Sequence, residues 1–251
     1  YRKIRNTFRY LLGNLNDNFE IIDLEKIELN KLPDLEQYML HKLYSLNNNF
    51  KKYFENYDFH NLYKELLNFC TVDLSAFYFD IRKDNLYCDP INSKKRKSTI
   101  LTLNIILNAL LKWFAPILSF TTEEIFRLLF KDQKSIHLEK FIEFPDKFKN
   151  EKLSKKWVEL INIRNICNIS IEEKRASKEI GSSLEADLKI QLSQKLKELT
   201  ENTDFSELCI TSKAEVIYKD NIETTAFTTK AKGSKCPVCW KINDGPCPRH
   251  S

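Results

Sequence analysis

The segment at residues 235–251, KCPVCWKINDGPCPRHS, is where side-chain types and their spacing could do chemistry. It contains two ligand pairs, C-x2-C and C-x2-H, with seven residues between them, which offer Cys236, Cys239, Cys247 and His250 as soft ligands. Two residues between the members of a pair let both side chains reach one ion. The pattern therefore predicts a tetrahedral, structural Zn²⁺ site at the C-terminus.

A metal would also explain how so short a segment becomes ordered. With one large aromatic residue it cannot build a hydrophobic core, whereas structural zinc supplies on the order of 10 kcal/mol of folding free energy. Prolines at 237, 246 and 248 lower the entropy that is lost when the turns close. Two alternatives stay open from the residues alone, an Fe–S cluster and a set of unrelated thiols. Because His250 lies next to the last residue, the fourth ligand could also be a water or another residue.

The rest of the sequence carries no recognisable catalytic constellation. It holds no nucleotide-binding glycine loop, no nucleophile elbow and no metalloprotease motif, so we predict no catalytic residue in this chain. The other cysteines have apolar neighbours, and the other histidines lack an acidic or cysteine partner in sequence. Buried thiols and capping or surface imidazoles are therefore expected at Cys70, Cys88, Cys167, Cys209, His41, His60 and His137.

The composition is typical of a globular protein with a mild basic excess. Of the 251 residues, 42% are hydrophobic and 30% charged, and the formal net charge is +5, which permits a polyanionic partner without requiring one. No apolar run reaches the roughly 20 residues that span a bilayer. There is no secretory start either, so we predict no membrane partner, a cytoplasmic location and reduced thiols.

Helical periodicity dominates residues 1–150 and predicts an antiparallel bundle of long helices joined by short connections. Apolar residues recur at helical spacing from the first residue, without an initial Met, which predicts a piece of a longer protein. One short strand is expected within residues 135–150. Five helices are predicted in this region. The first covers residues 1–15, and the other four begin at Asp34, at Asp58, after Ser93 and at a cap on Thr121 or Thr122.

The C-terminal part changes character twice. Residues 151–182 predict a long connecting helix that Gly181 ends. Residues 183–228 predict a small α+β unit, because Asp187–Leu192 alternates apolar and polar side chains. Residues 229–251 form the predicted zinc-binding module. The expected fold class is therefore mainly α, with a small α+β unit and a short metal-binding tail.

Basic and aromatic residues suggest nucleic-acid contacts. Arg2, Arg5 and Arg9 share one stripe of the first predicted helix, and the run KKRK at 94–97 opens another helix. These cations could hold phosphates, although charge runs are also common on solvated faces. Trp240, directly after the first ligand pair, is either the hydrophobic plug of a tiny domain or a platform on which an unpaired base stacks.

Several stretches resemble the C-terminal part of bacterial isoleucyl-tRNA synthetases, which are class I aminoacyl-tRNA synthetases. They occur in the family's order and cover nearly the whole chain: YRKIRNTFRYLLGNL, YDFHNLYKELLNFCTVDLSAFYFDIRKDNLY, LLKWFAPILSFTTEEIF, EIGSSLEADL and KCPVCW. The first and third also resemble other class I synthetases, including the valyl enzyme. EIGSSLEADL followed by a CxxCW tail is specific to the isoleucyl family.

The resemblance implies a helical-bundle anticodon-binding domain, a unit near the tRNA stem and a zinc module at the anticodon loop. The implied partners are the anticodon stem-loop of tRNA(Ile) and upstream catalytic and editing domains of the same, monomeric chain. ATP and Mg²⁺ would serve only that full-length ligase, since the HIGH and KMSKS signatures are absent here. The RNA-contact residues implied by matching motifs are Arg5, Arg96 and Trp240, followed by Arg2, Lys97, Arg164 and Arg175.

The tail departs from the family pattern. His250 stands where the family has a further cysteine after a longer spacer, and Val238 stands where a basic residue is common. Cys3His remains a normal structural zinc set. Two other interpretations are a fragment of a valyl- or leucyl-type synthetase, which the CxxCW tail disfavours, and a helical protein-interaction module with structural zinc that never touches RNA.

Overall fold

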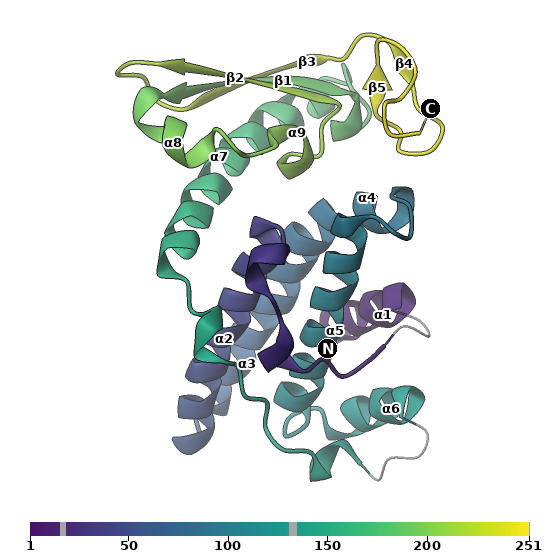
Figure 1. Ribbon diagram of the computed structural model, residues 1–251, viewed down its shortest axis with the longest axis vertical. Coiled ribbons are helices and arrows are strands. Elements are labelled where there is room, and N and C mark those ends of the chain that lie inside the picture. Colours follow the sequence, from purple (N-terminus) through teal and green to yellow (C-terminus); the bar gives the residue numbers. More distant parts are fainter. Residues whose placement is uncertain (16–18, 131–134, 251) are drawn as a thin grey trace. The chain divides into compact units, whose positions relative to one another are not determined.

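The structure, a computed structural model, describes residues 1–15, 19–130 and 135–250. The chain divides into two compact units, Tyr1–Ser154 and Lys155–Ser251. Helices dominate, and in the described residues strands occur only in the second unit (Figure 1). The predicted mainly helical class, with a small sheet region near the C-terminus, is confirmed. No helix in the described ranges is both long and apolar enough to cross a membrane.

The first unit is built from helices and short 3-10 turns. Two of its helices begin at side chains that cap the backbone: Asp58 accepts the Asn61 N–H (3.2 Å) and Ser93 accepts the Arg96 N–H (3.1 Å). Both starts were predicted from the sequence. The elements are α1 Arg2–Leu15, η2 Leu24–Lys26, η3 Leu29–Lys31, α2 Asp34–Glu55, α3 Phe59–Asn68, η4 Phe69–Tyr78, α4 Phe79–Cys88, α5 Lys94–Phe114, α6 Ser119–Leu129, η5 Ile136–Leu138 and η6 Asp146–Phe148.

A π-helical stretch, η4, joins α3 to α4 without a break. Its wider turn shows in the Ser75 hydroxyl, which donates to the Cys70 carbonyl five residues earlier (2.8 Å). The wider turn keeps Phe69, Leu74 and Phe77 buried on one side. The continuous segment therefore presents one apolar face although its helical type changes twice.

The core of the first unit is aromatic and aliphatic around Trp113 of α5, which is fully buried. Its ring packs edge-to-face on Phe50 of α2, with 4.9 Å between centroids. Its indole N–H donates to the Asn47 side-chain oxygen (2.9 Å), so the polar atom of this large side chain is satisfied inside the core.

One ion pair lies inside this core. The Arg82 guanidinium of α4 donates through Nε and Nη2 to the two carboxylate oxygens of Glu36 of α2, at 2.6 and 2.7 Å. Glu36 is 0% and Arg82 3% exposed, and the Tyr78 hydroxyl adds a third bond to Glu36 (3.1 Å). The two bonds from Arg82 thus offset the free-energy cost of removing the Glu36 carboxylate from water.

The second unit is a small sheet packed on helices. Strand β1 is central, parallel to β2 and antiparallel to β3. One face of β1 is buried, and Ser170 of the long helix α7 bonds Thr228 of β3 (2.9 Å), which ties that helix to the sheet. The elements are α7 Glu151–Ala176, η7 Ser183–Glu185, β1 Ala186–Ser193, η8 Gln194–Leu196, α8 Lys197–Thr200, α9 Phe205–Leu208, β2 Lys213–Lys219, β3 Thr225–Lys230, β4 Ser234–Lys235 and β5 Ile242–Asn243.

Three local predictions were wrong. Residues 135–150, all of which the structure describes, contain 3-10 turns and no strand, with Ser135 capping the first turn. Helix α6 begins at Ser119, so neither of the two threonines predicted as its cap precedes it. The connecting helix ends at Ala176, where the positive φ of Lys178 (61°) turns the chain before Gly181 is reached.

Candidate metal centre and RNA-contact residues

The metal-binding tail is organised by a short hairpin, β4 paired with β5. Beyond β4 the backbone turns back at once: the Trp240 N–H donates to the Cys236 carbonyl (3.0 Å), and the Cys236 N–H donates to the Lys241 carbonyl (2.9 Å). Gly233 permits the hairpin to close, because its φ is +121° and a Cβ there would lie 2.1 Å from the Asn243 carbonyl oxygen.

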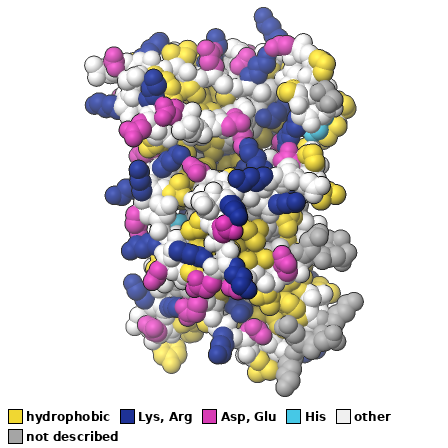
Figure 2. Space-filling view, in the orientation of Figure 1, with side chains coloured by type: hydrophobic (Ala, Val, Ile, Leu, Met, Phe, Trp, Pro, Cys, Tyr) yellow, Lys and Arg dark blue, Asp and Glu magenta, His cyan; other side chains and the backbone are white. Residues whose placement is uncertain are grey.

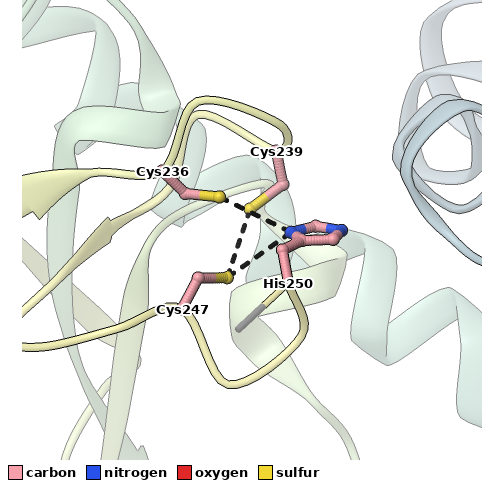
Figure 3. A group of neighbouring side chains, drawn as sticks. All are labelled: Cys236, Cys239, Cys247 and His250. Atoms are coloured by element: carbon pink, nitrogen blue, oxygen red, sulfur yellow. Dashed lines mark hydrogen bonds between the residues drawn. The ribbon is translucent and has the colours of Figure 1, made fainter.

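The four predicted ligands meet in one cluster (Figure 3). Their donor atoms all lie within 4.8 Å of one another. Nδ1 of His250 is 3.5 Å from Sγ of both Cys236 and Cys247, and Sγ of Cys239 is 3.8 Å from Sγ of Cys247. With Zn–S near 2.3 Å and Zn–N near 2.05 Å, a tetrahedral site places neighbouring ligand atoms about 3.8 Å (S···S) and about 3.5 Å (S···N) apart. The donor set therefore fits a zinc ion.

The two thiols of the first ligand pair have different environments, and the backbone around Cys236 favours a thiolate there. Amide groups of Cys239 and Val238 donate to the sulfur of Cys236 and lower the pKa of that thiol to about 6. Burial acts in the opposite direction on Cys239 and raises the pKa of its thiol to about 11. Coordination to a cation deprotonates such a thiol outright, so metal would be needed to hold both sulfurs as ligands.

Trp240 lies beside the cluster with an exposed ring. Its side chain is 58% exposed and its φ is +64°, a backbone region that a bulky residue rarely adopts. Nζ of Lys235 lies 5.2 Å from the ring centroid, which is a cation–π contact. The exposed ring agrees poorly with a hydrophobic plug and leaves a surface on which a base could stack.

The arginines predicted on α1 differ in their contacts. Arg5 donates to the Tyr1 hydroxyl (2.9 Å) and to Glu124 of α6 (3.2 Å), so its guanidinium ties α1 to α6. Arg2 is exposed, and nothing in the described residues bonds to its side chain. Arg2 is thus the freer of the two cations.

The basic start of α5 places Lys97 on the surface and Arg96 at half burial. The Arg96 Nη1 donates to the Asp89 carbonyl (2.8 Å), and in the described part of the chain nothing bonds to its Nε or Nη2. Helix α5 has no acidic residue in its first turn. One edge of the Arg96 fork is therefore held and the other is open.

The two arginines predicted on α7 have separate environments. Arg164 is buried (8% exposed), and its Nε donates to the Leu208 carbonyl (2.9 Å), which joins α7 to the end of α9. Arg164 is therefore buried, whereas the RNA contact that the resemblance implies for it would need an open guanidinium. Arg175 is exposed and pairs with Glu172 three residues earlier (2.6 Å). The described structure does not bring these two side chains together.

Residues 36–192 match the family model described as the anticodon-binding domain of tRNA ligase, which is more than half of the chain. This chain belongs to that family. The matched range of this anticodon-binding family member runs from α2 to near the end of β1. The metal-binding tail, α1 and Trp240 lie outside it.

Curated relatives extend over the rest of this family member. Isoleucine--tRNA ligase of Pelagibacter ubique (strain HTCC1062) is 68% identical over 100% of the chain and 28% of its own length. The enzymes of Bartonella henselae and Agrobacterium fabrum are 38% and 37% identical over 96% of the chain and 26% of their length. The chain thus spans about a quarter of the length of these relatives.

Sequence reasoning missed two residues of this anticodon-binding family member. Lys235 reaches the face of Trp240 because the β4–β5 hairpin returns the chain on itself, and no periodic pattern announces this contact. Asp89 holds Arg96 through its carbonyl. The dipeptide Asp89–Pro90 is a turn signal that could have drawn attention to it.

Proposed function

We propose that this chain recognises the anticodon stem-loop of tRNA(Ile) as the C-terminal, tRNA-binding part of an isoleucine–tRNA ligase. The observation that carries the proposal is the 68% identity with such a ligase along the whole chain, together with the match to the anticodon-binding domain family. ATP-dependent aminoacylation would be performed by upstream catalytic domains, with ATP and Mg²⁺ bound there. The ligase would act as a cytoplasmic monomer.

In this proposal the helices of residues 1–150 form the antiparallel bundle of class I synthetases. Residues 151–182 connect it to a stem-contact unit at 183–228 and a zinc module at 229–251. Zn²⁺ would be structural: Cys236, Cys239, Cys247 and His250 supply all four positions of a tetrahedron and leave none for a substrate. The ion would cross-link the turns of a segment that has no core of its own.

RNA recognition would combine phosphate contacts with stacking. Arg2, Arg5, Arg96, Lys97 and Arg175 are the proposed phosphate contacts. Among them, Arg5 and Arg175 already bond to neighbouring side chains, whereas Arg2, Lys97 and the open edge of Arg96 have no bond within the described residues that would have to be broken. Trp240 would stack on an unpaired base, with Lys235 already over its ring. We leave the buried Arg164 out of this set.

Binding of a synthetic anticodon stem-loop RNA to the zinc-loaded chain tests the proposal. Since stacking on an aromatic contributes about 1–3 kcal/mol, Trp240→Ala should weaken binding by roughly 5- to 150-fold. Affinity should also fall steeply as salt rises, because phosphate contacts release counterions. The protein-interaction alternative predicts no RNA binding and no salt dependence of this kind. Trp157→Phe is the matched control, since Trp157 is buried.

A further inference from the structure

The turn between α4 and α5 holds a chain of polar contacts that ends at Arg96. Asp89 follows the last residue of α4 and precedes Pro90, which disfavours helical backbone at residue 89. Its φ and ψ of −78° and 148° are accordingly extended. The chain therefore leaves the α4 axis at Asp89, and its carbonyl accepts the Arg96 Nη1 at 2.8 Å rather than a helical N–H.

The Asp89 side chain fixes this turn from both sides. Its Oδ2 accepts from Nδ2 of Asn85 on α4 (3.0 Å) and from the Ser93 hydroxyl (3.2 Å). That hydroxyl also accepts the Arg96 N–H (3.1 Å) and so caps α5. Asp89 thus fixes Arg96 in two ways. Its carboxylate orients the Ser93 hydroxyl that accepts the Arg96 backbone N–H, and its carbonyl accepts from the Arg96 guanidinium.

The chain of contacts continues into the core. Asn85 is buried and accepts from Nη1 of Arg82 (3.4 Å), the arginine whose other nitrogens hold Glu36. The chain of contacts that starts at Arg96 therefore ends at the bidentate Arg82–Glu36 ion pair, which is almost fully buried. Rigid support of this kind is what a recognition group needs, since a fixed side chain loses little rotamer entropy on binding.

We propose that Asp89 is a positioning residue, which presents the open edge of the Arg96 guanidinium as a preformed fork for an RNA phosphate. The inference rests on the proposed function, because it presumes that Arg96 touches RNA. One nitrogen of Arg96 is committed to Asp89, and the Nε/Nη2 edge has the spacing that two phosphate oxygens accept.

Removing the Asp89 side chain should change RNA affinity in the direction opposite to that expected from its charge alone. Asp89 carries a negative charge next to the proposed phosphate site, so removing it should strengthen RNA binding if charge alone matters. We instead expect Asp89→Ala to weaken binding of the anticodon stem-loop RNA about three- to tenfold. Asp89→Asn should restore near-normal affinity, because its amide oxygen can still accept from Asn85 and Ser93. Glu55→Ala is the charge-matched control, since Glu55 is exposed at the end of α2 and has no bond within the described residues.

The decisive measurement is a double-mutant cycle on the full 251-residue chain, with folding checked by thermal unfolding. Arg96→Ala should weaken binding about tenfold, as for a lost charge-assisted bond. In that background Asp89→Ala should change nothing further. Unchanged or tighter binding by Asp89→Ala, or additive losses, would overturn the positioning role while leaving RNA binding intact. No effect of Arg96→Ala, or no RNA binding by the unchanged chain, would remove the contact on which the inference rests.

Discussion

Removing one partner of the buried pair Glu36–Arg82 should lower the free energy of unfolding strongly, whereas replacing both partners by apolar residues should change it little. Arg82→Met leaves a carboxylate that is 0% exposed with the Tyr78 hydroxyl as its remaining partner, in place of two short bonds from a guanidinium. Orphaning a buried charge of this kind costs about 3–5 kcal/mol. With a urea m-value of about 2–3 kcal/mol/M, the unfolding midpoint should fall by roughly 1–2.5 M.

The double variant Glu36→Met with Arg82→Met separates the cost of an orphaned charge from the net contribution of the ion pair to the free energy of unfolding. Two apolar side chains of similar volume leave no uncompensated charge, so unfolding should return to within about 1 kcal/mol of the unchanged chain. The assay is urea unfolding followed by fluorescence of Trp113, with Trp157 and Trp240 replaced by Phe so that only the first unit reports. A loss below about 1 kcal/mol for Arg82→Met, or a double variant as unstable as the single one, would refute the reasoning.

Three further predictions concern the tail and one buried imidazole. Gly233→Ala should weaken zinc binding at least tenfold, because its Cβ would meet the Asn243 carbonyl; competition with a chromogenic chelator measures this. Removing zinc, or His250→Ala, should abolish the dispersed NMR signals of residues 233–250 while those of α5 remain. Burial lowers the pKa of His41 below 6.5 more than Glu151 raises it, so the neutral imidazole accepts the Asn150 N–H (2.9 Å). The stability that it contributes should be complete above pH 6.5 and be lost as the pH falls through the lowered pKa, as urea unfolding against pH would show.

Each of these three predictions has an outcome that would contradict it, and the first has a matched control. Gly245→Ala places a Cβ with nothing within 4 Å, so a similar loss of zinc affinity there would contradict the steric argument. A tail that keeps its dispersed signals after chelation would contradict a structural ion. His41→Gln should flatten the stability profile between pH 6.5 and the lowered pKa, and an unchanged slope would assign the titration to another group.

The sequence predicted most reliably where one local interaction decides the structure. Caps at Asp58 and Ser93 satisfy exposed N–H groups whatever the rest of the fold does. The ligand pairs at Cys236 and Cys247 likewise specify their own turns through spacing. Predictions from isolated signals were weaker: Gly181 is a good terminator, but Lys178 ends the helix sooner by taking a positive φ.

Features set by distant residues were beyond sequence reasoning. Arg164 is buried because the Leu208 carbonyl, 44 residues away, accepts its Nε, and nothing in the pattern of α7 marks it as inward. Residues 59–88 form one continuous helical segment that changes from α to π and back, and apolar periodicity predicted the helical segment but not its type. The contact between Lys235 and Trp240 depends on the hairpin that brings them together.

The measurement that tests the central claim most directly compares two RNAs on the zinc-loaded chain: the anticodon stem-loops of isoleucine and valine tRNAs, at matched salt. The proposed function predicts tighter binding of the isoleucine stem-loop, with the preference lost on Trp240→Ala or on chelation of zinc. Equal affinity for both stem-loops, or a preference that survives both changes, would contradict anticodon recognition by this chain.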